Sequence, residues 1–186
     1  MMRFVKMILL MLAIMVSGCV YSQSKHDSTI FWTQDVQLRW SDFKGAVPDP
    51  APKWDATSFV ELKTKARWVH GVPDFEVYAV FQRYDSWTRN STSSLLLKHE
   101  QLHFDIGELY VRKMRKELSA LRSKREGTPK DYLQVFDRLA EECNEMDSLY
   151  DAETAHGVYQ SQQEVWNKKI AKELFRLRKY ADDGFE

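Results

Sequence analysis

The sequence predicts an α+β fold, in which a small N-terminal antiparallel sheet is followed by three helices. Two observations indicate this class. Over residues 60–81 apolar side chains alternate with charged ones, which is the period of two of a half-buried strand. After residue 90 the apolar residues instead recur every three or four positions, as on the buried face of a helix. Even without its first 18 residues, the 186-residue chain is long enough for one domain with a substantial core.

Residues 1–18 have the pattern of a secretory signal. Arg3 and Lys6 precede an apolar run over residues 7–16, which is shorter than the roughly 20 residues that a membrane-spanning helix needs. Val16-Ser17-Gly18-Cys19 resembles a bacterial lipobox, so we expect lipidated Cys19 to become the mature N-terminus. We therefore expect an exported lipoprotein of the bacterial cell envelope, facing the periplasm or the cell surface. Ordinary signal cleavage, which would release a soluble periplasmic or secreted protein, is the alternative.

The composition of the mature chain is nearly neutral. Without residues 1–18 it carries 25 basic and 27 acidic residues, a formal charge of −2 with histidine neutral. This balance does not indicate nucleic acid or an anionic membrane surface as a partner. Lipidation of Cys19 would leave Cys143 as the last thiol, so the core must hold the domain together without an intramolecular disulfide. Cys143 lies on an apolar helix stripe, which predicts a buried and inert thiol.

The N-terminal half of the chain predicts the sheet. Residues 20–29 are polar and are expected to tether the lipid anchor to a single domain over residues 30–186. A short strand is expected over residues 36–40, before a loop rich in proline. Two alternating runs, residues 60–68 and 75–81, are separated by a turn that contains glycine and proline, which predicts an antiparallel hairpin.

The C-terminal half predicts three helices. Several serine and threonine residues over residues 90–94 can cap a first helix that extends to about residue 125. Thr128 and Pro129 have the pattern of the start of a second helix, whose apolar residues recur in steps of four and three as far as Tyr150. A third helix is expected over about residues 159–180, with one apolar face and a charged remainder.

One short segment carries a metal-binding pattern. Residues 98–103 contain His99-Glu100-Gln101-Leu102-His103, the HExxH pattern of zinc metallopeptidases. Residues four apart lie one turn apart on the same helix face, so both imidazoles can reach one ion, with Glu100 about 100° round the helix. Zinc lowers the pKa of a bound water to about 7, and a neighbouring carboxylate can accept its proton. We predict His99 and His103 as Zn²⁺ ligands and Glu100 as the general base.

The residues around this pattern support the metal interpretation. Leu102, Ile106 and Tyr110 continue the apolar stripe that holds both histidines, so the imidazoles are expected to face the core. Buried imidazoles need polar partners, and one shared cation would satisfy both. A pair of hydrogen-bonded core histidines without metal is the alternative.

A third protein ligand is expected, because a catalytic zinc usually has three protein ligands and one open position. His26 lies in the tether and His70 in the hairpin turn, where a surface role is the simplest interpretation. His156 follows the second helix, which a helical hairpin brings back beside the first, so we predict it as the third ligand. Asp151 and Glu153 are the carboxylate alternatives, and Asp151 could instead orient a ligand histidine.

These segments resemble a known bacterial family. Residues 96–106, together with Tyr150-Asp151 and residues 154–157, are similar to the family called domain of unknown function 922, and residues 38–45 resemble its opening Trp-x-Asp-Phe-x-Gly pattern. The resemblance covers nearly all of the mature chain. That family is described as predicted secreted zinc-dependent proteases, so the resemblance implies a zincin-like metal site and supplies no substrate.

The sequence therefore favours an exported zinc metallopeptidase that acts on a peptide or protein substrate, with Glu100 as the base. A zinc amidase that acts on cell-wall peptides is the second hypothesis, since export alone is equally compatible with it. A non-catalytic metal-binding envelope lipoprotein is the third, and a closed site with four protein ligands would favour it. The glutamate favours an enzyme, because a structural zinc site does not require that residue.

Overall fold

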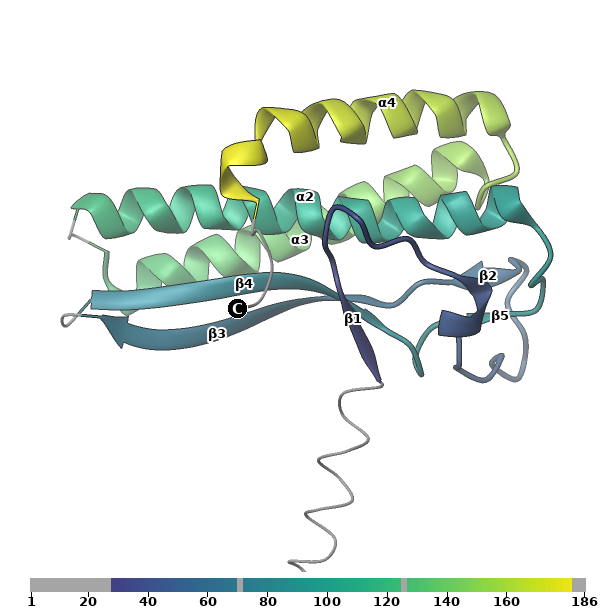
Figure 1. Cartoon of the computed structure of the whole chain (residues 1–186), viewed down its shortest axis with the longest axis horizontal. Coiled ribbons are helices and arrows are strands. Elements are labelled where there is room, and N and C mark those ends of the chain that lie inside the picture. The colour runs from purple at the N-terminus through teal and green to yellow at the C-terminus, as the bar shows by residue number, and fades with distance from the viewer. Residues whose placement is uncertain (1–27, 70–71, 125–126, 182–186) are drawn as a thin grey trace, which may run out of the picture.

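The computed structural model describes residues 28–69, 72–124 and 127–181, with a sheet on one side and three helices on the other (Figure 1). The main sheet is antiparallel and has the strand order β1 (Thr29–Phe31), β4 (Val72–Gln82), β3 (Val60–Val69). The helices α2 (Ser94–Lys124), α3 (Pro129–Thr154) and α4 (Gln160–Arg176) follow it in sequence. The predicted α+β class, with the sheet before three helices, is confirmed.

The predicted hairpin is formed by β3 and β4. Their register extends from Val60 opposite Phe81 to Val69 opposite Val72. The alternating residues Val77, Ala79 and Phe81 of β4 are buried under the helices, as the period of two predicts. A second, two-stranded sheet pairs β2 (Ala56–Thr57) with β5 (Trp87–Thr88) close to the start of α2.

The prediction of a short strand over residues 36–40 is wrong, because the described chain forms no strand between β1 and β2. The backbone N–H of Leu38 donates 2.8 Å to the side-chain oxygen of Gln101 on α2, where a strand would pair with another strand. Trp40 then begins a single 3-10 turn that ends at Asp42. The aromatic residues of this segment pack against the core from an irregular backbone.

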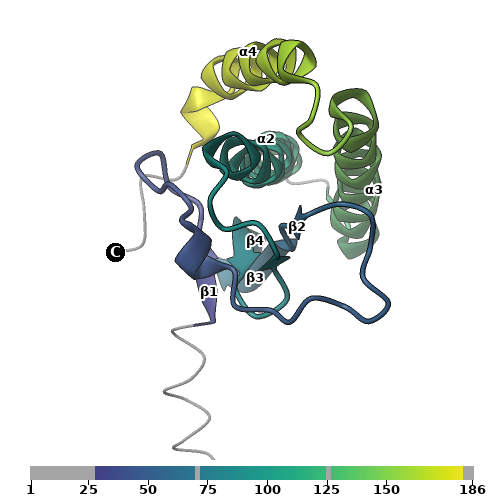
Figure 2. The ribbon, with the colours of Figure 1, turned by 90° about the vertical axis from the view of Figure 1, so that its right-hand side faces the viewer.

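Helix α2 is the centre of the molecule, and Figure 2 shows it surrounded by the sheet, α3 and α4. It begins after Ser93, whose hydroxyl oxygen accepts the backbone N–H of Leu96 at 3.1 Å. Gly107 lets the sheet approach closely, since a Cβ there would lie 2.7 Å from Cγ1 of Val60. A side chain at this position would push α2 away from β3.

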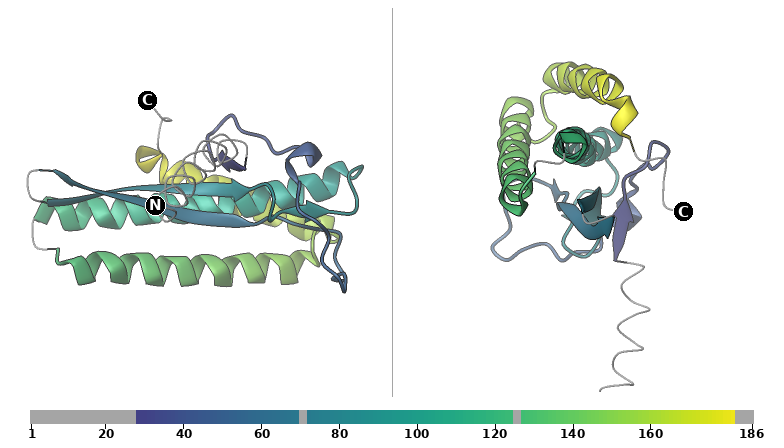
Figure 3. Two further views of the ribbon diagram at one scale, coloured as in Figure 1. Left: turned by 90° about the horizontal axis from the view of Figure 1, so that it is seen from below. Right: turned by 90° about the vertical axis from the view of Figure 1, so that its left-hand side faces the viewer.

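Helices α2 and α3 lie side by side and antiparallel (Figure 3). Near one end Arg138 pairs with Glu117, and at the other end Asp151 contacts His99. As predicted, Thr128 caps α3: its hydroxyl accepts the N–H of Asp131, and the Asp131 carboxylate accepts the N–H of Thr128. The apolar residues of α3 in contact with the core include Tyr132, Leu139, Cys143 and Tyr150.

The predicted third helix is α4, which is followed by a 3-10 turn, Arg178–Tyr180. Trp166 and Ile170 of α4 are buried in the common core. Cys143 is also buried, and burial raises the pKa of its thiol to about 12, so the thiol is protonated and unreactive at neutral pH.

The expectations for the N-terminus concern residues outside the part of the chain that the structure describes. This applies to the signal at residues 1–18, to Cys19, and to His26 and the tether except for its last two residues. His70 of the hairpin turn lies outside the described residues as well. Within residues 28–69, 72–124 and 127–181, none of the helices combines the length and the hydropathy that crossing a membrane requires.

Candidate metal centre

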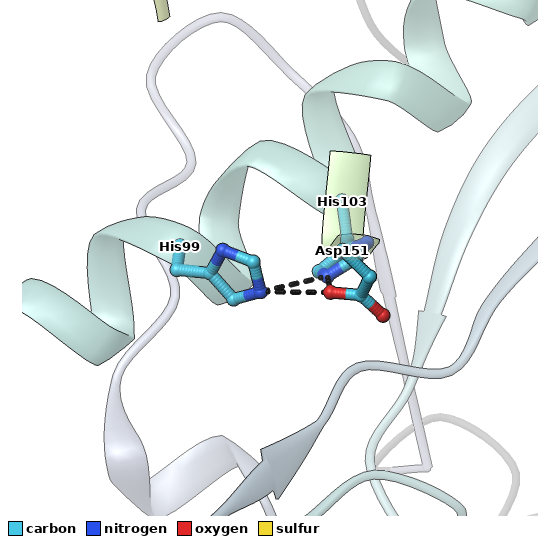
Figure 4. A group of neighbouring side chains, drawn as sticks. All are labelled: His99, His103 and Asp151. Carbon is cyan, nitrogen blue, oxygen red and sulfur yellow. Dashed lines mark hydrogen bonds and ion pairs between the residues drawn. The ribbon is translucent and has the colours of Figure 1, made fainter. Parts of the chain in front are cut away.

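Three side chains from two antiparallel helices converge on one point at the end where α2 begins and α3 ends (Figure 4). Nε2 of His99 lies 3.0 Å from Oδ1 of Asp151, and Nε2 of His103 lies 3.2 Å from the same oxygen. The two Nε2 atoms are themselves 3.2 Å apart. The HExxH spacing therefore places both imidazoles on one face of α2, as predicted, and Asp151 of α3 faces them.

These three distances match the ligands of one small cation. Zinc binds imidazole nitrogen and carboxylate oxygen at about 2.0–2.2 Å, so two ligands at a tetrahedral angle lie about 3.3 Å apart. The three measured separations, 3.0, 3.2 and 3.2 Å, outline one face of such a tetrahedron. His99, His103 and Asp151 can thus hold a tetrahedral ion and leave a fourth position open.

The outer nitrogen of each imidazole is held by an oxygen acceptor. Nδ1 of His99 lies 3.1 Å from Oε1 of Gln163 on α4, and Nδ1 of His103 lies 2.6 Å from Oδ1 of Asp147 on α3. The Gln163 amide is oriented by its own donation to Asn167 and by the Tyr150 hydroxyl, which donates to Oε1. In a neutral imidazole, Nδ1 then carries the hydrogen and Nε2 carries the lone pair.

The hydrogen bonds at both Nδ1 atoms leave the Nε2 lone pairs of His99 and His103 directed at each other and at Asp151. In the neutral state the two Nε2 lone pairs and the Asp151 carboxylate oxygen face one another at 3.0–3.2 Å in a largely buried site. Such a group of acceptors repels itself unless a proton or a cation lies among them. The donor set of two imidazoles and one carboxylate suits zinc and similar divalent ions.

Without a metal, a proton takes this place. Burial by itself would lower the pKa of His103, but the carboxylates of Asp147 and Asp151 outweigh it and raise that pKa well above 6.5. Burial also works to raise the pKa of Asp151, yet hydrogen bonds from His103 and His99 hold it well below its ordinary value. The metal-free site therefore pairs a protonated His103 with the partly exposed carboxylate of Asp151, and a divalent cation can take the place of the proton.

Glu100 is buried beside the two histidines and has 2% of its surface exposed. Burial raises the pKa of its carboxyl group, while the nearby His103 and His99 lower it in part. The hydroxyl of Ser58 donates to Oε2 of Glu100 at 2.8 Å and holds the carboxyl group in place. Ser58 comes from the segment between β2 and β3, so the sheet side of the molecule contributes to the site as well.

The predicted third ligand, His156, lies at the edge of this group. Its Nδ1 is 3.2 Å from Oδ1 of Asp151, and its half-exposed ring stacks on Trp54 with the ring centroids 4.9 Å apart. The donor atoms that gather within 4.8 Å of one another belong to His99, His103 and Asp151. The structure thus brings the carboxylate alternative, Asp151, into the ligand position and leaves His156 as its neighbour. Glu153, the other carboxylate alternative, accepts a hydrogen bond from the Trp166 indole instead.

An unusual turn after α3 places His156. Ala155, His156 and Gly157 all have positive φ angles, of 48°, 52° and 82°. The first two are unfavourable for residues with a Cβ, at about 1–2 kcal/mol each. Gly157 is also packed against His99, since a Cβ there would lie 3.0 Å from the Cβ and Cγ atoms of His99. The buried hydroxyl of Thr154 donates to the Tyr150 carbonyl and anchors the end of α3.

Three residues of the site were not assigned a role from the sequence: Ser58, Asp147 and Gln163. Asp147 had a usable signal, because it lies four residues before Asp151 and repeats on α3 the spacing of the two histidines on α2. Tyr150 stacks on His99 with centroids 4.6 Å apart and donates to its backbone oxygen at 3.1 Å. Ser58 and Gln163 reach the site only through the tertiary fold and have no local signal.

A family model described as "Bacterial protein of unknown function (DUF922)" matches residues 51–157, which include β2 to β5, α2, α3 and every residue of the candidate metal centre except Gln163. No curated protein and no solved structure matches this chain.

Proposed function

The chain belongs to the DUF922 family of bacterial proteins of unknown function, and we propose that it is a zinc-dependent metallopeptidase. The observation that carries this proposal is the convergence of His99 Nε2, His103 Nε2 and Asp151 Oδ1 within 3.2 Å of one another. The hydrogen bonds at both Nδ1 atoms support it, because they direct the two lone pairs into the site. Among the described residues three donors gather, which is the number typical of a catalytic zinc with an open position.

Zinc at this position would polarise the substrate carbonyl and make a water molecule more acidic. The protein contributes the proton transfers. Glu100 is the residue proposed to accept the proton of the attacking water and to donate it to the leaving amine. Its hydrogen bond from Ser58 fixes the carboxyl group, so that the base does not need to reorient during the reaction.

The proposed ligands are His99, His103 and Asp151, with Asp147 and Gln163 holding the two imidazoles. His156, which the sequence predicted as a ligand, is not one of the proposed ligands. It lies beside Asp151, and its Nδ1 is 3.2 Å from the carboxylate oxygen. The sequence pattern of residues 1–19 supports an exported lipoprotein, anchored at Cys19, as the form in which the enzyme acts.

Elemental analysis and peptide hydrolysis test this function together. We expect one zinc per chain after reconstitution, and cleavage of a mixed peptide pool that Glu100→Gln abolishes while zinc stays bound. Glu117→Gln, on the distal half of the same helix, is the matched control and should retain activity. Zinc-replete protein that is inert on all peptides would contradict the peptidase proposal, and cleavage confined to cell-wall peptides would assign an amidase.

A further inference from the structure

A cavity of about 610 Å³ adjoins the candidate metal centre. The backbone segments that line it lie at the end of the molecule that faces the viewer in Figure 2. Its volume lies in the range of about 300–1,000 Å³ that is typical of small-ligand pockets. Three separate segments form its walls: residues 53–55, residues 90–96 at the start of α2, and residues 155–160 between α3 and α4.

The cavity borders the metal centre, because two residues of its wall contact the proposed ligand residues. His156 lines the cavity and contacts Oδ1 of Asp151 through Nδ1 at 3.2 Å. Gly157, the next wall residue, is packed directly on His99. A group bound in the cavity therefore lies next to residues that contact Asp151 and His99.

The lining of this cavity combines polar residues with large apolar side chains that are exposed. Trp54, Leu95 and Val158 have 38%, 49% and 70% of their surfaces exposed, although all three are large apolar residues. Apolar residues that are exposed together, around a concave surface, are typical of binding sites. Trp54 presents a flat aromatic face that is fixed by stacking on His156 and by a hydrogen bond from its indole N–H to Thr57.

The charges at this cavity disfavour a basic occupant. Asp55 is paired with Arg89 at 2.8 Å, so part of its negative charge is compensated within the protein. Lys53 is the other charged residue of the lining, and it disfavours a basic side chain. On one side of the wall, the turn with positive φ angles at residues 155–157 places His156 beside Asp151.

We propose that this cavity binds an apolar side chain of the peptide substrate, adjacent to the bond that is cleaved. The inference rests on the proposed function, because the metal centre is what would fix the peptide bond beside the cavity. It adds a substrate class: peptides with a large aliphatic or aromatic residue next to the scissile bond.

Hydroxamates of single amino acids test the proposal on the zinc-loaded full-length protein, since the hydroxamate group binds zinc and the side chain probes the cavity. N-acetylphenylalanine hydroxamate and N-acetylleucine hydroxamate should bind about tenfold or more tightly than N-acetylglycine hydroxamate, as expected for burial of one large apolar side chain. N-acetyllysine hydroxamate with a free ε-amino group should bind no better than the glycine compound. Inhibitor dissociation constants from calorimetry give these ratios.

Two variants test whether the preference for a large apolar side chain comes from this cavity. Val158→Glu, at a position with 70% exposure, should reduce the preference for phenylalanine over glycine at least about fivefold and improve binding of the lysine compound. Trp54→Ala should reduce the phenylalanine preference in the same way. Trp68→Ala is the matched control, an exposed tryptophan near the tip of the β3–β4 hairpin, and should leave all ratios unchanged.

The outcomes separate the two proposals. If N-acetylglycine hydroxamate binds to the zinc protein but the phenylalanine compound binds no more tightly, the metal centre stands and the subsite is overturned. The same conclusion follows if the preference is present but survives both Val158→Glu and Trp54→Ala. If no hydroxamate binds and no zinc is retained, the metal-dependent function fails, and this inference fails with it.

Discussion

His103 Nδ1 and Asp147 Oδ1 lie 2.6 Å apart, one helical turn along from the contact between His99 and Asp151. Two imidazoles four residues apart on α2 thus face two carboxylates four residues apart on α3. Asp151 contacts the inner nitrogens, whereas Asp147 holds the outer nitrogen of His103. The pair of antiparallel helices therefore supplies both the metal-facing oxygen and the group that orients a ligand.

Asp147→Ala should weaken zinc binding about 10–100-fold, because the outer nitrogen of His103 loses its acceptor and the ring loses its fixed orientation. Competition with a chelator of known affinity measures the change. Asp137→Ala, an exposed carboxylate on the same helix, is the control and should bind zinc normally. Equal affinities in the two variants would show that Asp147 does not orient His103.

Asp151→Ala and His156→Ala should differ in zinc content. We expect Asp151→Ala to lose stoichiometric zinc, since it removes the oxygen that lies 3.0 and 3.2 Å from the two Nε2 atoms. His156→Ala should retain one zinc per chain. Elemental analysis after dialysis separates the two, and the reverse result would establish His156 as the third ligand.

Zinc should oppose the pH dependence of stability that the metal-free protein shows. In the metal-free protein the pKa of His103 is raised well above 6.5, so the folded state binds this proton more tightly than the unfolded chain. That stabilisation is complete below the unfolded pKa near 6.5 and is lost as the pH rises through the folded pKa. Zinc requires the neutral imidazole, so its stabilising effect should grow over the same interval.

Thermal unfolding from about pH 6 to about pH 9 measures this effect. With EDTA the Tm should fall as the pH rises, whereas the increase in Tm on addition of zinc should become larger. In His103→Gln the fall with EDTA should be much smaller, because the titrating imidazole is absent. A Tm in EDTA that rises with pH in the unsubstituted protein would contradict the raised pKa of His103.

Gly157→Ala should destabilise the protein by about 1–3 kcal/mol and lower its zinc affinity. The new Cβ adopts an unfavourable φ of 82° and meets His99 at 3.0 Å. Ala155→Gly is the informative counterpart, since it removes a Cβ from a residue with φ of 48° and should leave stability equal or higher. Denaturant unfolding gives both values, and a neutral Gly157→Ala would show that the turn can relax.

Local patterns in the sequence predicted the elements of this fold well. Alternation gave the β3–β4 hairpin, and Thr128 with Pro129 gave the start of α3, because both depend on near neighbours in the chain. The prediction of a strand over residues 36–40 was wrong, because the side chain of Gln101 on α2 accepts the hydrogen bond of the Leu38 N–H. A partner 63 residues away leaves no trace in a local pattern.

The candidate site was predictable to the extent that one helix determines it. His99, Glu100 and His103 share α2, so their relative directions follow from their spacing. The choice between Asp151 and His156 depends on where α3 ends and on three left-handed residues after it, which the sequence does not specify. Gln163 comes from α4 and reaches His99 only when all three helices are packed.

Because α2 pairs with α3, the number of residues along much of α3 matters more for the site than the identity of each residue. Each residue added to a helix turns everything beyond it by about 100° and shifts it by 1.5 Å. Between the cap at Thr128 and the carboxylate of Asp147, one inserted or deleted residue would therefore rotate both acidic groups away from the imidazoles. Substitutions at exposed positions there leave the site unchanged, whereas an insertion or deletion would turn the carboxylates of α3 away from the imidazoles of α2.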